Sequence, residues 1–335
     1  MKFYLFDSHD PYYNLALEEY LFRRGEGDIF ILWQNEPSVI LGKNQNAYLE
    51  LDGELAEKCG IHTVRRITGG GAVYHDLGNV NYSFISDKRG GIDFEYFSSP
   101  IISALLSLGV KVSLSGRNDL VSEGGFKVSG NAQCSADGRV LHHGTLLFDT
   151  DLTMLSRVLK PDEEKLREKS IASVRSRVCN IRELMAEKID TPSFIERLSD
   201  FVTGELGAVR CEAPCTEEID RLCLRNRSRE WIYPERDYVA LYTVSRRRRY
   251  PYGVVECRME MKNDYIKTLH LYGDFFGEGD VSEIERALSG TELSRVEAVL
   301  TAFDVGRYVF GMTSAELLGL VLGKEEIANV SHSGS

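Results

Sequence analysis

The sequence has no excess of positive charge. Its 40 lysines and arginines are outnumbered by 51 aspartates and glutamates, which gives a formal net charge of −11. Because a basic surface supplies most of the affinity of a general nucleic-acid-binding protein, this balance argues against nucleic acid as a partner. A hydrophobic share of 43% over 335 residues allows a large buried core, and the length favours two domains.

Patterned cysteines and membrane-spanning segments are also lacking. The seven cysteines show no repeated short spacing of the kind that forms a zinc site or a disulfide framework, so we expect reduced thiols. No uncharged run reaches the roughly 18 residues needed to span a bilayer. The N-terminal region carries Asp7, Asp10 and Glu18 in place of a basic segment followed by an apolar one. We therefore expect a cytoplasmic protein without a membrane partner.

Two common nucleotide-binding patterns are missing, although a glycine-rich run is present. The run Arg65-Arg66-Ile67-Thr68-Gly69-Gly70-Gly71 stands between the β-rich segments His62–Val64 and Val80–Ile85 rather than before a helix. Tyr74 takes the place of the third glycine of G-x-G-x-x-G, and no Walker A pattern occurs. Three consecutive glycines let backbone N–H groups approach a phosphate or a carboxylate closely, next to arginine charge. The alternative is a plain glycine-rich turn.

Further motifs follow the glycine-rich run in a fixed order. They are His75-Asp76-Leu77-Gly78-Asn79, Ser115-Gly116-Arg117-Asn118-Asp119-Leu120, Lys127-Val128-Ser129-Gly130-Asn131-Ala132, His142-His143-Gly144-Thr145-Leu146-Leu147, Ser173-Val174-Arg175-Ser176-Arg177-Val178 and Gly273-Asp274-Phe275-Phe276-Gly277. Any one motif is a weak signal, but the joint order is specific. Together with the arginine pair and the triple glycine, these motifs make the chain resemble the lipoate-protein ligase family, from Asp7 to about Gly290.

The resemblance implies an α+β fold in two domains. Residues 1–245 are expected to form a large catalytic domain like that of class II synthetases and biotin ligases, with mixed or antiparallel sheets and flanking helices. Residues 246–330 are expected to form a small two-layer α/β accessory domain. The run Arg246–Arg249 marks the boundary. We interpret it as a linker whose charges form salt bridges, with a phosphate or nucleic-acid patch as the alternative.

The resemblance also implies an ATP-dependent reaction in two steps. Lipoate, or octanoate, would be activated to an acyl-AMP with release of pyrophosphate, and Mg²⁺ would accompany the ATP. The acyl group would then pass to a lysine of a lipoyl domain, in the E2 subunits of 2-oxoacid dehydrogenases or in the H protein of glycine cleavage. Both steps develop negative charge at one point, which backbone N–H groups, an arginine and a lysine can stabilise.

Family members hold the acyl-adenylate with the counterparts of a small set of residues. Here these are Arg66, Gly71, Ala72, Val73, Tyr74 and Lys127, and Lys127 is the expected catalytic residue. The wider ligand-binding set is predicted to include Thr68, Gly69, Gly70, His75, Asn79, Ser129, Gly130, His143, Val174 and Arg175. The charged segment Lys160–Asn180, which contains Val174 and Arg175, is expected to be a mobile loop that closes over the adenylate. Arg65 should face the other side of its strand and serve the fold.

Several of these residues have a plain structural alternative. Thr68 either contacts the ligand or caps its turn, and Asn79 either binds the adenine or ribose or simply occupies a left-handed turn. Asp119 is a candidate Mg²⁺ ligand, because magnesium takes one or two carboxylates beside phosphates, with a cap as the alternative. Adjacent strand residues point to opposite faces, so we do not expect His142 and His143 to share a metal ion, and we expect His143 beside the acyl chain.

Other functions fit parts of the pattern. An ATP-independent octanoyl- or lipoyl-transferase would use a cysteine thioester, for which Cys134 and Cys179 are candidates, but such enzymes resemble only the large domain. A non-catalytic lipoate-binding regulator would keep the glycine-rich run, but the retained Lys127 argues against it. A ligase that only transfers from preformed lipoyl-AMP is a further alternative. A biotin ligase is disfavoured, since no Gly-Arg-Gly-Arg run occurs.

Overall fold

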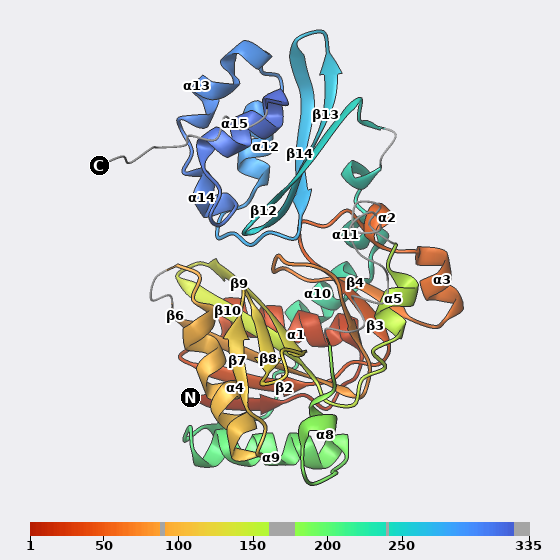
Figure 1. The fold of residues 1–335 in the computed structure, drawn as a ribbon, viewed down its shortest axis with the longest axis vertical. Helices are drawn as coiled ribbons and strands as arrows, with labels where there is room; N and C mark the ends of the chain where they lie inside the picture. The colour runs from red at the N-terminus through yellow and green to blue at the C-terminus, as the bar shows by residue number, and fades with distance from the viewer. Residues whose placement is uncertain (88–90, 161–177, 239–240, 325–335) are drawn as a thin grey trace. The chain divides into compact units, whose positions relative to one another are not determined.

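The computed structural model describes residues 1–87, 91–160, 178–238 and 241–324 (Figure 1). Its contacts divide the chain into two units, the first ending at Asp237 and the second beginning at Tyr238. The predicted domain boundary after residue 245 therefore falls inside a strand of the second unit, Val244–Tyr250. Among the residues described, no helix is both long enough and apolar enough to cross a membrane.

A large mixed sheet forms the centre of the first unit (Figure 1). In spatial order its strands are β11 (Val209–Arg210), β1 (Lys2–Leu5), β2 (Ile29–Trp33), β6 (Asn79–Asp87), β10 (Arg139–Leu147), β9 (Lys127–Ala136), β8 (Asp119–Ser122) and β7 (Val112–Ser115). β1 is parallel to β11 and β2, and the other neighbours are antiparallel. All residues of β2 are buried, as its uninterrupted apolar run predicts for a central strand.

A smaller sheet carries the glycine-rich run. Strand β3 (Ser38–Leu41) lies between β4 (His62–Arg65), to which it is parallel, and β5 (Val73–His75), to which it is antiparallel. The run leaves β4 and enters β5. It therefore connects two strands, as predicted from its β-rich flanks, and not a strand and a helix.

Helices flank the sheets of the first unit. They are α1 (Pro11–Arg24), α2 (Ala47–Glu50), α3 (Gly53–Lys58), α4 (Phe94–Ser107), α5 (Met154–Val158), α8 (Ile181–Leu184), α9 (Thr191–Gly204), α10 (Glu217–Arg227) and α11 (Arg229–Ile232), with the 3-10 turn η1 (Glu235–Asp237). The start of α1 follows from local chemistry. Asp10 accepts a hydrogen bond from the amide of Tyr12, and Pro11 stands where no backbone donor is needed.

Two apolar cores cover opposite faces of the large sheet. Phe30 and Leu32 pack into a core that includes residues of α4 and α9, whereas their strand neighbours Ile29 and Ile31 pack with residues of α1 and α10. This division follows the alternation of side chains along β2. The predicted α+β architecture, with a mixed sheet between flanking helices, is confirmed.

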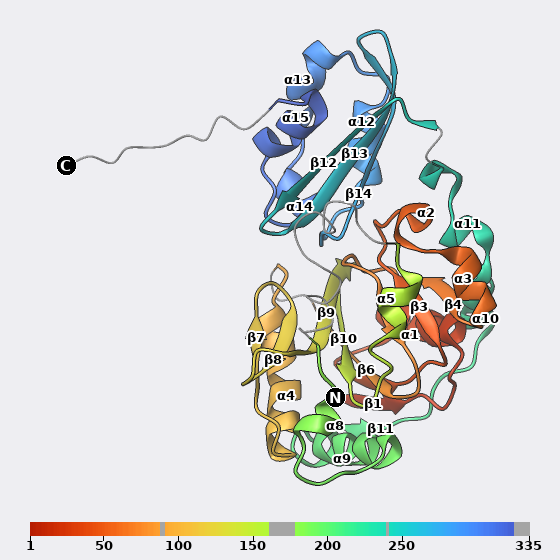
Figure 2. The same ribbon diagram turned by 45° about the vertical axis from the view of Figure 1, so that its right-hand side comes forward.

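The second unit is a two-layer α/β domain, as predicted (Figure 2). Its antiparallel sheet has the order β12 (Val244–Tyr250), β13 (Gly253–Lys262) and β14 (Tyr265–Gly273), and helices cover one face. These helices are α12 (Ser282–Leu288), α13 (Val296–Leu300), α14 (Val305–Tyr308) and α15 (Ser314–Leu322), with the 3-10 turn η3 (Leu293–Arg295). Apolar residues of β13, β14 and the helices form a core of their own.

The run Arg246–Arg249 is part of strand β12, so its interpretation as a linker was wrong. Alternate arginines are exposed, and the two half-buried ones reach the end of α15. The guanidinium of Arg246 donates to the carbonyl of Val321, and that of Arg248 donates to the carbonyl of Lys324 at 3.0 Å. Positive charge is favourable at a helix C-terminus. The four consecutive arginines of this strand give no hydrophobic periodicity between Val244 and Tyr250, which explains why the sequence did not reveal it.

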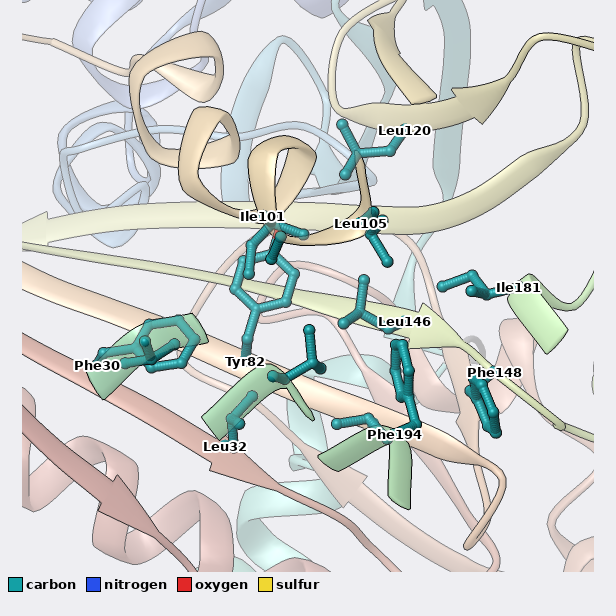
Figure 3. Packing of buried hydrophobic residues seen from close by; sticks show 14 of the residues in the cluster. Phe30, Leu32, Tyr82, Ile101, Leu105, Leu120, Leu146, Phe148, Ile181 and Phe194 are labelled. Atoms are coloured by element: carbon teal, nitrogen blue, oxygen red, sulfur yellow. The ribbon is translucent and has the colours of Figure 1, made fainter. Parts of the chain in front are cut away.

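The packing of the core that contains Phe30 and Leu32 allows a prediction about stability (Figure 3). Phe194 is fully buried and stacks on Phe148 with ring centroids 4.2 Å apart. We expect Phe194→Ala to lower the free energy of unfolding by about 3–5 kcal/mol, because truncation leaves a cavity that the packed core fills only in part. Phe126 is 40% exposed, so Phe126→Ala should lower the free energy of unfolding by less than about 1 kcal/mol. Urea unfolding of both variants gives the comparison, and equal losses would contradict it.

Candidate active site

The glycine-rich loop packs against the residue that follows β3. A Cβ atom added at Gly42 would lie 2.0 Å from the carbonyl oxygen of Gly70, so the two backbones are in contact. Gly70 itself has φ +90°, a conformation that residues with side chains rarely adopt. The shape of the loop therefore requires glycine at both positions.

The side chain of Arg66 is buried within this loop. Its Nη2 group donates to the carbonyls of Gly69 at 2.6 Å and Gly71 at 2.9 Å, its Nη1 group to the carbonyl of Ile40 at 3.0 Å, and Nε to the hydroxyl of Thr68 at 2.9 Å. Burial lowers the pKa of Arg66 to about 10, which leaves the guanidinium charged at neutral pH. Arg66 thus holds the loop carbonyls, and its predicted contact with the ligand stays a prediction.

Arg65 serves the fold, as its position in the strand led us to expect. Its Nη1 group donates to the carbonyl of Gln45 at 2.6 Å, and its Nη2 group donates to the carbonyl of Ile232 at 2.7 Å. The same Nη2 group lies 3.0 Å from Oδ2 of Asp237, and both of these charged side chains are buried. Asp237 also accepts a hydrogen bond from the amide of Ala47. Arg65 therefore ties β4 to the last residue of the first unit.

A chain of hydrogen bonds runs from the loop to helix α1. Oγ1 of Thr68 lies 2.8 Å from Nε2 of His143, and Nδ1 of His143 lies 2.9 Å from Oε1 of Glu18. With a neutral imidazole the directions are consistent, because His143 donates to Glu18 and accepts from Thr68, which accepts from Arg66. All four side chains are buried, so Glu18 supplies the negative charge that balances Arg66.

Glu18 was not among the predicted site residues. It lies three residues after Leu15 and four before Phe22, both buried, and is itself 1% exposed. A carboxylate on the apolar stripe of a predicted helix is the signal that would have found it. The turn-capping alternative for Thr68 does not describe its contacts, since its hydroxyl bonds side chains of β10 and of Arg66.

A β-bulge in β9 brings Lys127 beside Asp119. Asp119 pairs with Gly130 and Val121 pairs with Lys127, so two steps along β8 match three steps along β9. In a regular strand residues 127 and 130 would point to opposite faces, but the extra residue brings them to one face. A Cβ atom at Gly130 would lie 2.8 Å from Nζ of Lys127, and that Nζ lies 2.7 Å from Oδ1 of Asp119. The side chains of Lys127 and Asp119 are 33% and 36% exposed, so a ligand can reach both.

Other predicted residues lie on β5 and β6. Tyr74 and His75 are buried on β5, and Nδ1 of His75 accepts from Nδ2 of Asn35 at 3.0 Å. Burial lowers the pKa of His75 to about 3 and raises that of Tyr74 to about 12. Asn79 is a buried strand residue that donates to Asn81 at 2.9 Å, so the left-handed-turn alternative for it was wrong.

The remaining predicted residues are placed in part. Gly71, Ala72 and Val73 are half-buried at the outer edge of the glycine-rich loop, and Ser129 is fully buried on β9. Residues 161–177, including Val174 and Arg175, lie outside the described residues. The predicted closing loop therefore stays a prediction.

His142 occupies the face of β10 opposite to His143. Its ring stacks on Phe97 with centroids 5.3 Å apart and lies near the edge of Phe94 at 5.7 Å. Neither ring nitrogen has a hydrogen-bond partner among the residues described, and burial lowers the pKa of His142 to about 3. The expectation that the two histidines face opposite sides is confirmed. The described part of the chain contains no group of three His, Cys, Asp or Glu arranged to hold a metal ion.

The candidate cysteines are poorly suited to nucleophilic chemistry. Burial raises the pKa of Cys134 to about 12, with a further contribution from Glu18, and burial also raises the pKa of Cys179. A thiol must ionise to act as a nucleophile. Both thiols are therefore protonated at neutral pH.

Comparison with known proteins identifies the family of this chain. A family model of the lipoyl protein ligase A/B catalytic domain matches residues 10–203, and a model of the bacterial lipoate protein ligase C-terminus matches residues 240–321. The chain belongs to the lipoate-protein ligase family. Lipoate-protein ligase LplJ of Bacillus subtilis is 39% identical over 327 residues, covering 93% of this chain and 97% of LplJ. The predicted family and enzyme class are confirmed.

Solved structures show the same fold. A bipartite lipoate protein ligase of Thermoplasma acidophilum, described with its E2 lipoyl domain, is 31% identical with a TM-score of 0.61, covering 70% of this chain and 96% of its own. A lipoate-protein ligase A bound with ATP is 27% identical with a TM-score of 0.59, covering 70% of this chain and 98% of its own. The lipoate-protein ligase fold thus accounts for most of the chain.

The buried histidines predict a pH dependence of stability. An unfolded histidine titrates near pH 6.5, whereas folded His75 and His142 titrate at about 3. Unfolding therefore takes up protons between these values, and stability falls as the pH falls below 6.5. His142→Phe removes one such group from an aromatic pocket. Between pH 7 and pH 5 this variant should lose about 2 kcal/mol less free energy of unfolding than the wild type. Identical losses in urea titrations would show that His142 is not buried in the neutral form.

Proposed function

We propose that this ligase activates lipoate with ATP and then transfers the lipoyl group to a lysine of a lipoyl domain. The observation that carries the proposal is the orientation of the glycine-rich loop. The carbonyls of Gly69 and Gly71 point to Arg66. Because C=O and N–H of a trans peptide point in opposite directions, the N–H groups of Gly70 and Ala72 point away from that guanidinium. Such N–H groups form an anion-binding surface.

The first step joins lipoate to AMP. A carboxylate oxygen of lipoate attacks the α-phosphorus of ATP, the bond between the α-phosphorus and its bridging oxygen breaks, and pyrophosphate leaves with the bond's electron pair. Charge grows on the α-phosphate oxygens during this attack. The loop N–H groups and the ammonium of Lys127 are the fixed donors that would stabilise it.

The second step forms the amide. The lysine amine of the acceptor attacks the lipoyl carbonyl carbon, the bond from that carbon to the phosphate oxygen breaks, and AMP leaves while the amine loses a proton to solvent. Negative charge develops on the carbonyl oxygen and on the departing phosphate. One ammonium, that of Lys127, would serve both charges, and no covalent enzyme intermediate is needed.

The related structures support ATP and a lipoyl domain as substrates of this scheme. The ligase A homologue was solved with ATP, and the archaeal homologue is described with an E2 lipoyl domain. We propose lipoate or octanoate as the acid, and the E2 lipoyl domains and the H protein as acceptors, on the basis of membership of the family. Residues 71–73 are half-buried, so part of their surface is accessible to a ligand.

Among the residues described, the carboxylate of Asp119 fits a role as a ligand of Mg²⁺. Asp119 is partly exposed and lies beside Lys127, and magnesium commonly takes only one or two carboxylates when it binds phosphates. Asp119 would therefore be its protein ligand. When bound, Mg²⁺ would neutralise phosphate charge and favour departure of pyrophosphate.

One contact favours the thioester transferase as a second candidate function. The amide of Cys179 donates to the carbonyl of Lys127 at 3.1 Å, which places this cysteine next to the predicted catalytic lysine. The raised pKa of its thiol argues against a nucleophilic role at neutral pH. The two functions can be distinguished by experiment, because the ligase requires ATP and no thiol, whereas the transferase requires a thiol and no ATP.

Lys127→Ala should lose both half-reactions. We expect adenylation of lipoate and transfer from supplied lipoyl-AMP each to fall by at least about a hundredfold, the effect of removing one donor to a developing oxyanion. Lys111→Ala is the matched control, since Lys111 is an exposed strand-edge lysine that also has an acidic partner, Glu123 at 3.3 Å. Near-normal lipoylation by purified Lys127→Ala protein would contradict the assignment.

Removal of either candidate thiol should leave the ligase active. We expect Cys134→Ala and Cys179→Ala to retain ATP-dependent lipoylation within about threefold of the wild type, because a mixed anhydride needs no thiol nucleophile. Circular dichroism checks that each variant is folded. A folded variant without turnover would make the thioester transferase the better description.

A further inference from the structure

Three strands of the large sheet place a tyrosine, a glycine and an asparagine in one row. Tyr82 on β6 pairs with Gly144 on β10, and Gly144 pairs with Asn131 on β9. The hydroxyl of Tyr82 donates to Oδ1 of Asn131 across the middle strand. A Cβ atom at Gly144 would lie 2.2 Å from that Oδ1 and 2.7 Å from the tyrosine ring. Only a residue without a side chain allows the two outer side chains to meet.

Asn131 is also bonded in both directions to Asn118. The backbone amide of Asn131 donates to the carbonyl of Asn118 at 2.9 Å, and Nδ2 of Asn131 donates to the same carbonyl at 3.0 Å. In return, Nδ2 of Asn118 donates to the carbonyl of Asn131 at 2.6 Å. We call these three hydrogen bonds the asparagine clasp. The clasp fixes the backbone at the end of the β8–β9 ladder.

The clasp adjoins the ion pair of the active site through Asp119. Asp119 comes directly after Asn118 and pairs with Gly130, which comes directly before Asn131. Oδ1 of Asp119 lies 2.7 Å from Nζ of Lys127, and that ammonium rests over Gly130. Any shift of the chain at residue 118 would therefore move the carboxylate that holds Lys127.

We propose that Asn131 is a positioning residue for Lys127, acting through Asn118 and Asp119, with Tyr82 fixing its orientation. The inference rests on the proposed catalytic role of Lys127. It gives a reason for three features of the sequence motifs that ligand binding does not explain: Asn118 before Asp119, Asn131 after Gly130, and Gly144 after the histidine pair.

The burial of Tyr82 supports an orienting role for its hydroxyl. Tyr82 is fully buried in the first apolar core, among side chains such as Leu105 and Leu146 (Figure 3). A hydroxyl in such surroundings is unfavourable unless it is hydrogen-bonded. Its bond to Asn131 leaves the amide nitrogen of that side chain directed at Asn118. A phenylalanine would fill the same space without this constraint.

Tyr82→Phe tests the proposal without adding or removing bulk in the core. Tyr4→Phe is the matched control, because Tyr4 is a buried tyrosine of the same sheet, on β1, with β2, β6 and β10 between it and β9. Gly144→Ala is a second variant, which displaces Asn131 by contact alone. Hydrogen exchange followed by mass spectrometry, on the ligand-free full chain, reports on the clasp independently of activity. Steady-state lipoylation kinetics report on its consequence.

We expect faster exchange in peptides covering residues 116–121 of Tyr82→Phe, and no change in peptides covering residues 29–33. The kcat for lipoylation should fall about tenfold with KM for lipoate unchanged within about twofold, as for a group that acts on the transition state. In an Asp119→Asn background, Tyr82→Phe should have no further effect on kcat, because the clasp then has no carboxylate to place.

Two other results would overturn the proposal. Wild-type exchange at residues 116–121 in both Tyr82→Phe and Gly144→Ala would show that the clasp does not depend on the row of three residues. If Tyr82→Phe lowers kcat by the same factor in the Asp119→Asn background as in the wild type, Tyr82 and Asn131 act outside the ion pair. Faster exchange together with normal kcat would overturn the positioning role if Lys127→Ala is inactive, and would contradict the catalytic role of Lys127 if that variant is active.

Discussion

The geometry of the active site depends on one buried charge, the guanidinium of Arg66. It binds the carbonyls of Gly69 and Gly71 on one side of the glycine-rich loop, and the N–H groups of Gly70 and Ala72 consequently face the other side. A buried cation of this kind needs a counter-charge, which Glu18 provides through His143 and Thr68. An arginine that never leaves the loop can thus create the anion-binding surface. In the proposed function, its contribution to ligand binding would be the orientation of backbone dipoles.

The two arginines of the pair have different roles, since Arg65 stabilises the fold and Arg66 shapes the active site. Arg65 bonds backbone carbonyls and the buried carboxylate of Asp237, which joins the small sheet to the end of the first unit. Arg66 shapes the loop that follows. On the neighbouring sheet, a bulge and a glycine place the ammonium of Lys127 beside Asp119. The proposed chemistry therefore draws on the glycine-rich loop and on the β8–β9 ladder, each held by buried polar contacts.

Much of this site could be predicted from the sequence, because its motifs lie in short segments whose local structure the sequence determines. The strand-to-strand position of the glycine-rich run and the structural role of Arg65 follow from β-rich flanks and from alternation. The bulge at Lys127 could not be predicted, since it exists only in the pairing with β8. Glu18 was missed because its partner His143 is distant in sequence. Strand β12 was missed because its arginines carry no apolar signal.

In the proposed reaction, ATP activates the acid at this site before any acceptor is present. Exchange of labelled pyrophosphate into ATP, measured with the purified full chain, Mg²⁺ and lipoate but no lipoyl domain, tests this order. Exchange should require lipoate and should disappear in Lys127→Ala. Absence of exchange in the wild-type protein, combined with transfer of an acyl group from a thioester donor without ATP, would contradict it.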